Sequence, residues 1–420
     1  MIDFVYYLVL VLEIVLLVSF ERRKWGTLVT PFNMLAILFG IVTTIAILYS
    51  WTVPGVKSFY LPSLIIWIIG LAFFYVPAAL LPVKRQRQNY YEIEVSKNKY
   101  DPYKALFAIT LFVGMIALLK VRSAAGAGGG DALIGTDEFS ENYDASGGLL
   151  AHLSMFLSIM FAYFMYKLDK RHKLAIIPII LILVIQLAQA SKTHILTPLI
   201  MGLFTRVLTG KTKLSLRIIV IAALAGAGVF FGIYFIALVL SGATDSYEVY
   251  LGFVSKHFLV YFLGGSLSFS LDYQMGIKEP IMTEQLYAPF IAVWEKITGI
   301  TSAATVDNPI FMDMGELGST NVRTFFGTMY AYSHSYTTLI ITSLFIGFVV
   351  YFIYYLSYNK KNIFLTIATS ANLTYLVFGA FFDYYWLRIY AYEIIAICLM
   401  LCFFTSFKHE TKVKTASAAS

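Results

Sequence analysis

Charged residues are scarce in this chain. They make up 13% of its 420 residues, whereas a water-soluble protein of this length carries roughly a quarter. Apolar residues reach 59% and gather in long runs. Runs of this kind exclude an ordinary soluble domain and indicate a protein that crosses a membrane several times.

Cysteine is nearly absent as well. The chain has two cysteines, Cys398 and Cys402, placed one helical turn apart in the last apolar run. This spacing is neither a CxxC motif nor a disulfide framework. The sequence also lacks a Ser–His–Asp spacing, paired zinc ligands and a dinucleotide fingerprint. We therefore predict no metal and no cofactor.

Apolar segments of suitable length are what the chain has in abundance. A helix needs about 20 residues to cross a hydrocarbon core of ~30 Å. We predict a helix for each of eleven segments, because lipid cannot satisfy open backbone groups. They cover about residues 2–20, 29–50, 61–83, 104–120, 147–167, 173–190, 193–208, 214–240, 335–357, 362–381 and 386–407. The "ASKT" between the sixth and seventh leaves open a hairpin or one interrupted helix.

The basic residues define an orientation. Most of the 31 Lys and Arg lie in alternate connecting segments, such as "ERRK" at 21–24 and "KLDKRHK" at 167–173. The positive-inside rule places these segments in the cytoplasm, with the amino terminus outside and the carboxyl terminus inside. The net charge of +7 therefore reflects membrane topology, and we predict no nucleic-acid partner.

The predicted fold is an all-α polytopic membrane protein of about 11 transmembrane helices with one large external loop. Residues 1–240 hold helices 1–8, with a Gly-rich and acidic external loop at 121–146. Residues 241–334 form the large loop, 335–407 hold helices 9–11, and 408–420 form a cytoplasmic tail. The large loop is expected to carry short amphipathic helices. One is predicted at 284–298 from helical spacing of apolar residues at Leu286, Phe290, Val293, Trp294 and Ile297.

Several polar residues allow two interpretations each. Arg323 is a clamp for an anion or an anchor at a helix end. Lys192 ends a polar stripe inside a helix bundle or lies exposed to solvent at the tip of an external hairpin. His257 and His334 are general bases or structural histidines. The aromatic stretch "FFDYYWLRIYAYE" at 381–393, which includes Arg388, is a glycan groove or an interfacial aromatic belt.

Three stretches carry a resemblance to a known family. "YFLGGSLSFSLDYQ" at 261–274 and "NVRTFFGTMYAYSH" at 321–334 resemble motifs of the Wzy-type O-antigen and capsular oligosaccharide repeat-unit polymerases. "ASKTHILTPLIMG" at 190–202 looks like the start of a central helix in that family. Two departures stand out. Lys192 replaces the usual arginine, and Tyr332-Ser333-His334 replaces a common Asp-Phe-Gly.

The resemblance implies a glycosyltransferase at the outer leaflet of the bacterial inner membrane. Its donor and acceptor would be glycans on undecaprenyl diphosphate, with membrane lipid, a chain-length regulator and a flippase as candidate partners. Charge grows on the leaving diphosphate, which calls for cations, and the attacking hydroxyl benefits from a base. The candidate substrate-binding residues are Arg323, Lys192, Arg122, Arg388 and Asn321. The candidate bases are His334, His257, Asp272 and Glu316.

Two other functions remain open at this point. A flippase or other transporter of lipid-linked oligosaccharides would favour short loops on both sides and charges at mid-span. This chain concentrates its polar residues in one outer loop, which favours an enzyme. An O-antigen ligase would use similar chemistry, and "GGSLSFSLDY" leans toward the polymerase.

Overall fold

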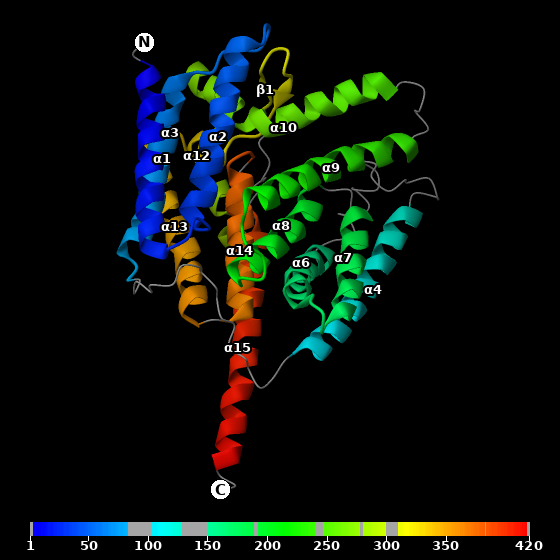
Figure 1. Ribbon diagram of the computed structural model, residues 1–420. Helices are drawn as coiled ribbons and strands as arrows, with labels where there is room; N and C mark the ends of the chain where they lie inside the picture. Colours follow the sequence, from blue (N-terminus) through cyan, green and yellow to red (C-terminus); the bar gives the residue numbers. More distant parts are fainter. Residues whose placement is uncertain are drawn as a thin grey trace. The chain divides into compact units, whose positions relative to one another are not determined.

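The computed structural model describes residues 3–82, 102–127, 149–188, 192–240, 247–277, 280–299, 310–360, 362–382 and 384–417. Within these ranges the protein is almost wholly helical (Figure 1). The acidic part of the predicted 121–146 loop, Lys278 and Asp383 lie outside them.

The helices follow the apolar segments closely. In chain order the elements are α1 (Phe4–Trp25), α2 (Pro31–Thr52), η1 (Leu61–Leu64), α3 (Ile65–Leu80), α4 (Tyr103–Ala127), α6 (Leu149–Lys167), η2 (Lys173–Ala175), α7 (Ile176–Ala188), α8 (Lys192–Leu208), α9 (Leu216–Leu240), α10 (Tyr247–Met275), η4 (Thr283–Tyr287), α11 (Ala288–Thr298), β1 (Met312–Asp313), β2 (Ser319–Thr320), α12 (Phe325–Ser333), α13 (Tyr336–Lys360), α14 (Ile363–Gly379), η5 (Tyr385–Leu387) and α15 (Ile389–Ser417). Each of the eleven predicted segments overlaps a helix in the described ranges.

Five helices in the described ranges are long and apolar enough to cross a membrane. They are α1, α2, η1 continued by α3, the Tyr103–Arg122 part of α4, and α13. Five further apolar helices of 10–17 described residues follow the same composition. The sixth and seventh predicted segments form two separate helices, α7 and α8, and both pack against α6.

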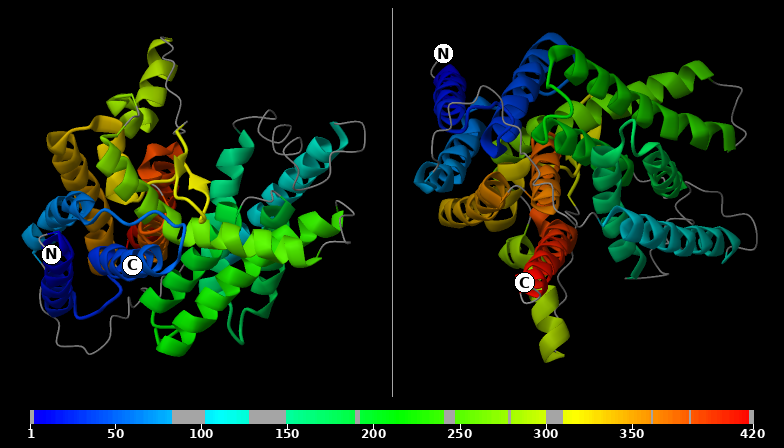
Figure 2. Two further views of the ribbon diagram at one scale, coloured as in Figure 1. Left: turned by 90° about the horizontal axis from the view of Figure 1, so that it is seen from above. Right: turned by 60° about the horizontal axis from the view of Figure 1, so that its bottom comes forward.

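The chain divides into two compact units. The first comprises residues 1–91, 250–355 and 375–392, and the second comprises residues 92–249, 356–374 and 393–420. In the first, α1 packs against α2 and α3, drawn in blue in Figure 1. In the second, α4 and α7 lie side by side, and α6 packs against both, in the views of Figures 1 and 2.

Two tyrosines of α13 tie it to the first two helices. The Tyr351 hydroxyl donates to Glu21 Oε1 at 2.6 Å and accepts from the Phe32 N–H at 3.0 Å. The Tyr354 hydroxyl donates to the Val29 carbonyl at 3.0 Å. Glu21 is fully buried, so the bond from Tyr351 holds a polar group that would otherwise be costly inside an apolar bundle.

The second unit is held by polar contacts between its own helices. His152 Nδ1 of α6 lies 2.8 Å from Glu393 Oε2 of α15. Thr205 donates to Ser370 Oγ at 3.0 Å. Arg206 Nη1 donates to the Met165 carbonyl at 2.7 Å, near the end of α6, where backbone carbonyls lack partners within the helix.

The prediction of a large loop with only short helices was wrong in its first part. Residues 247–275 form the 29-residue helix α10. The run of apolar residues ends at "GGSLSFSLD", because serines and an aspartate interrupt it. A serine does not end a helix, however, when its hydroxyl bonds to a carbonyl of the preceding turn. Ser270 donates to the Leu267 carbonyl at 2.8 Å in this way.

The predicted amphipathic helix is present, as η4 followed by α11. Leu286 is buried, whereas Trp294 is 63% exposed and Ile297 is 76% exposed. Phe290 and Val293 are also exposed. The helical spacing of these residues was therefore interpreted correctly, and most of the apolar face points away from the protein.

Candidate functional site

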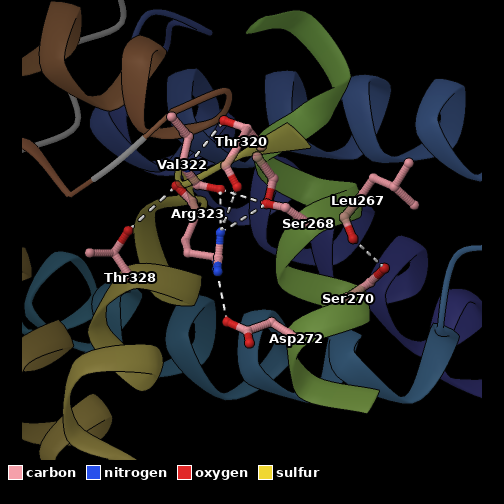
Figure 3. Close-up of polar contacts among 9 residues, drawn as sticks. Leu267, Ser268, Ser270, Asp272, Thr320, Val322, Arg323 and Thr328 are labelled. Carbon is pink, nitrogen blue, oxygen red and sulfur yellow. Dashed lines mark hydrogen bonds and ion pairs between the residues drawn. The ribbon is translucent and has the colours of Figure 1, made fainter. Parts of the chain in front are cut away.

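A buried ion pair joins the two stretches that the sequence singled out. Arg323 Nε donates to Asp272 Oδ2 at 2.8 Å (Figure 3). The Arg323 side chain is 1% exposed and the Asp272 side chain is 0% exposed. The two residues are 51 positions apart in the chain. The fold thus brings a predicted cation and a predicted base into direct contact.

The other side of the guanidinium is held by neutral oxygens. Arg323 Nη1 donates to the Val322 carbonyl at 3.2 Å, and to the Thr320 carbonyl and Ser268 Oγ at 3.4 Å each. Ser268 in turn donates to the Val322 carbonyl at 2.5 Å. The two bonds of Ser268, one from Arg323 Nη1 and one to the Val322 carbonyl, join the segment before α12 to α10, as Figure 3 shows.

The sequence of α10 explains how it supplies this face. Ser268 and Asp272 are four residues apart, so they lie on the same side of the helix. Gly264 and Gly265 lie one turn earlier, where other chain segments approach closely. A side chain at Gly265 would collide with the Phe381 carbonyl oxygen, and one at Gly264 would touch the Thr320 methyl at 3.2 Å. The paired glycines are therefore needed for packing around the ion pair.

The short helix α12, which follows Arg323, is buried by aromatic packing. Phe326 lies against Gly70 of α3, and Phe325 lies against Gly379 of α14. The Trp67 indole donates to Thr324 Oγ1 at 2.8 Å. A helix of nine residues is not stable alone, so this packing is what keeps Arg323 in place.

A small hairpin precedes Arg323 and is joined by backbone hydrogen bonds to the loop after α2. Strands β1 and β2 pair antiparallel, with Met312 opposite Thr320. The Lys57 N–H donates to the Met314 carbonyl at 3.1 Å, and the Glu316 N–H donates to the Gly55 carbonyl at 3.0 Å. A side-chain ion pair adds to these backbone bonds: Lys57 Nζ lies 2.8 Å from Asp313 Oδ2.

The Lys57–Asp313 pair predicts a pH dependence of stability. The Asp313 carboxylate accepts hydrogen bonds from Lys57 and from the Gly315 N–H, and these bonds hold the pKa of Asp313 below its ordinary value. A lowered folded-state pKa stabilises the fold above the unfolded-state pKa, and this contribution is lost as the pH falls through the folded value. Asp313→Asn should lower the melting temperature slightly at pH 7.

The measurement is thermal unfolding of the detergent-solubilised protein from pH 7 down to pH 3. The difference between the wild type and Asp313→Asn should shrink as the pH drops below the ordinary carboxylate pKa of about 3.9. The effect is small because both groups are exposed. A difference that stays constant with pH would show that the amide substitution acts through packing and not through charge.

His334 follows α12 in an unusual conformation. Its φ is +50°, in the left-handed region that favours glycine, and its N–H donates to the Tyr330 carbonyl at 2.8 Å. The imidazole is half-buried, and its Nε2 has no hydrogen-bond partner within the described ranges. His334 therefore ends the helix that begins just after Arg323, one helix length from the ion pair.

The remaining candidates of the first unit lie around or away from the pair. Asn321 is half-buried between β2 and Arg323. Glu316 is exposed in the hairpin turn. His257 is 15 residues before Asp272 on α10, which separates them by about 22 Å along the helix. Its ring is tilted by 36° against the ring of Phe253, with 4.3 Å between the ring centroids. Arg388 is exposed at the end of η5.

Two candidate cations belong to the second unit. Arg122 is exposed near the end of α4. Lys192 begins α8, and its side chain lies outside the part of the chain that the structure describes. Among the described residues, no group of three or more His, Cys, Asp or Glu could hold a metal ion.

Sequence reasoning missed Ser268, Thr320 and a group of tyrosines that includes Tyr273, the residue after Asp272. The four-residue spacing of Ser268 and Asp272 was the available signal, since it puts both on one helix face. Thr320 contributes a backbone carbonyl, which no side-chain pattern reveals. The tyrosines come from four separate segments, so only the fold brings them together.

These features define a class: a helical protein of the membrane type, with a buried arginine–aspartate pair between a long helix and the segment before a short one. The chain belongs to a family of unknown function, DUF6337, whose model matches residues 55–411. A search of the curated proteins found no significant match. A search of the solved structures found none either.

Proposed function

We propose that this protein is a membrane-embedded glycosyltransferase. It would polymerise oligosaccharide repeat units, carried on undecaprenyl diphosphate, into a surface polysaccharide such as O-antigen or capsule. One observation carries the proposal. The two stretches that resemble the polymerase motifs, 261–274 and 321–334, meet through the Asp272–Arg323 pair.

The chemistry assigns complementary roles to the pair. A hydroxyl of the acceptor glycan attacks the anomeric carbon of the donor, and the bond from that carbon to the diphosphate oxygen breaks. The electron pair of this bond leaves with the lipid diphosphate, and the hydroxyl proton goes to a base. Asp272 would be the base, and Arg323 would balance the charge that grows on the diphosphate.

The burial of the pair adds a step to this scheme. Arg323 Nε and Nη1 donate to oxygens of the chain itself, so a diphosphate must displace Asp272 Oδ2 to reach Nε. Guanidinium suits such an exchange, because it binds carboxylate and phosphate oxygens in the same geometry. The displaced carboxylate would then be ready to accept the proton. Donor binding and base release are thus coupled.

The departure from the family pattern at Tyr332-Ser333-His334 is consistent with this assignment of the base. The Asp-Phe-Gly of the polymerase stretch aligns its glycine with His334, whose backbone adopts a left-handed conformation. The histidine therefore occupies a position whose backbone conformation favours glycine. The buried Tyr332 stands where the polymerase stretch has its aspartate. Neither replaces a carboxylate, which leaves Asp272 as the acidic group beside Arg323.

The membrane orientation completes the proposal. The eleven helices would span the bacterial inner membrane, with the amino terminus outside and the carboxyl terminus in the cytoplasm. The ion pair would then lie on the outer side, near the start of α13. The donor and acceptor lipids would reach it from the outer leaflet, after a flippase has delivered them, and a chain-length regulator would act on the product.

Deletion of the gene tests the function directly. Surface glycan from the deletion strain should contain single repeat units without a ladder of longer chains on a gel. Loss of surface glycan with polymerised, lipid-linked material retained inside would indicate a ligase. Accumulation of lipid-linked units on the cytoplasmic leaflet would indicate a flippase. Normal long chains would exclude all three functions.

A further inference from the structure

A group of four tyrosines includes Tyr273, the residue that follows Asp272 in α10, and we call it the tyrosine cluster. It consists of Tyr60 before η1, Tyr273 of α10, Tyr330 of α12 and Tyr336 of α13. The hydroxyls of Tyr273 and Tyr336 are 2.9 Å apart. Ring centroids are separated by 6.4 Å between Tyr60 and Tyr273, 5.8 Å between Tyr273 and Tyr330, and 5.1 Å between Tyr330 and Tyr336.

The cluster is open on one side. Tyr336 is 40% exposed, and the other three tyrosines are half-buried. Two membrane-type helical segments begin beside it, since η1 starts at Leu61 and α13 starts at Tyr336. The Tyr60 N–H also donates to Ser270 Oγ at 3.4 Å, which fixes this tyrosine to α10. The cluster therefore lies where these two helical segments begin, and its member Tyr273 is adjacent to Asp272 in the sequence of α10.

The chemistry of the cluster is neutral, flat and hydroxyl-bearing. Burial raises the pKa values of Tyr273 and Tyr330, so both phenols keep their protons at physiological pH. The cluster offers aromatic faces together with hydroxyl groups that donate and accept hydrogen bonds. This combination suits a sugar ring, which has an apolar C–H face and a rim of hydroxyls. It does not suit a diphosphate, because the four side chains carry no positive charge.

We propose that the tyrosine cluster binds the pyranose rings of a glycan chain and holds them beside the ion pair. This inference rests on the proposed function, and it adds a binding site for the sugar portion of the substrate. The sugars stack on the exposed tyrosine faces, and the Tyr273–Tyr336 hydroxyl pair exchanges its mutual bond for bonds to sugar hydroxyls. An aromatic belt, by contrast, would contact lipid and would have no affinity for soluble glycan.

The test uses the full-length protein in detergent and a soluble probe. The probe is the set of oligosaccharides released by mild acid from the surface polysaccharide of the cells that encode the protein. Saturation-transfer NMR and a titration give the binding constant. Tyr336→Ala and Tyr330→Ala should each weaken binding about tenfold, which corresponds to ~1.4 kcal/mol. Tyr336→Phe should lose less, because it keeps the ring and removes only the hydroxyl.

The matched control is Tyr355→Ala. Tyr355 is also half-buried, but it lies 19 residues further along α13, about 28 Å away along the helix. Its binding constant should equal that of the wild type. Size-exclusion profiles check that each variant is folded, and Tyr336→Phe provides a conservative change if an alanine variant is not.

Two results would overturn the proposal. One is wild-type protein that shows no saturation transfer to the oligosaccharides. The other is a Tyr336→Ala variant that binds them as well as the wild type does. The gel of the deletion strain decides the proposed function separately. A deletion strain with normal ladders, combined with binding that depends on the cluster, would keep the glycan site and reject the polymerase.

Discussion

The double variant Arg323→Met with Asp272→Leu, which replaces both members of the buried ion pair, is expected to fold but to be unable to extend glycan chains. Arg323→Met alone should sharply reduce the amount of protein in the membrane, because it leaves the Asp272 charge buried without its cation. Breaking a buried pair in this way costs roughly 3–5 kcal/mol. Adding Asp272→Leu removes the orphaned charge, and apolar replacement of a whole buried pair is often neutral or stabilising.

The double variant separates packing from chemistry. Protein amount is measured by fluorescence of a carboxyl-terminal fusion, and chain extension is measured by the glycan ladder. If the pair performs the chemistry, Arg323→Met with Asp272→Leu gives wild-type protein amounts and only single repeat units. If the pair serves packing alone, the ladder returns together with the protein, and the proposed roles of Arg323 and Asp272 are wrong.

The exposed pair of Lys57 and Asp313 is the matched control for this experiment. It has the same 2.8 Å separation, but both groups are in contact with solvent. Lys57→Met with Asp313→Leu should change neither the protein amount nor the ladder by much, since pairs exposed to solvent contribute little to stability. A loss of ladder in this control would point to the hairpin, and not to the buried pair, as the working surface.

Alanine substitution at three glycines of α10 should give three different results. At Gly265 the added carbon meets the Phe381 carbonyl oxygen, a backbone atom that cannot move aside as a side chain can. Gly265→Ala should therefore cost at least ~1–3 kcal/mol and reduce the amount of folded protein. At Gly264 the neighbours are side-chain atoms, Thr320 Cγ2 at 3.2 Å and Met314 Cε at 3.4 Å. Gly264→Ala should be milder.

Gly252 completes the series, because nothing lies within 4 Å of an added carbon there. Gly252→Ala should stabilise the helix by up to about 1 kcal/mol, from helix propensity alone. Thermal unfolding of the three purified variants gives the order Gly252→Ala above wild type, then Gly264→Ala, then Gly265→Ala. Equal stability of the Gly264 and Gly265 variants would show that the backbone at Phe381 can move away from α10.

The sequence predicted the helices well and the contacts between them poorly. Apolar runs identify helices because lipid-facing and core-facing positions are both hydrophobic, so length alone gives α1, α2 and α13. The same rule failed for α10, where buried serines lower the apolar count without breaking the helix. The spacing of Leu286, Phe290 and Ile297 predicted α11, because an amphipathic surface helix keeps its period.

Arg323 shows where sequence reasoning about the site ends. Its place at a predicted membrane edge allowed a clamp or an anchor, and neither interpretation included a carboxylate partner 51 residues away. Such a pairing depends on how α12 packs against α3 and α14, which no local pattern encodes. The candidates His334 and Asn321 are near in sequence and share the segment. His257 shares a helix with Asp272 but lies several turns away.

The hydrogen bond between Tyr351 and Glu21 can form only late in the synthesis of the chain. The two residues are 330 positions apart, so α1 is made long before its partner on α13 leaves the ribosome. At 5–20 residues per second, the delay is roughly 15–65 seconds. During that time the Glu21 carboxyl must be held by water, by lipid headgroups or by an insertion factor. A chain that stops before residue 351 never acquires this hydroxyl, and quality-control proteases should remove it.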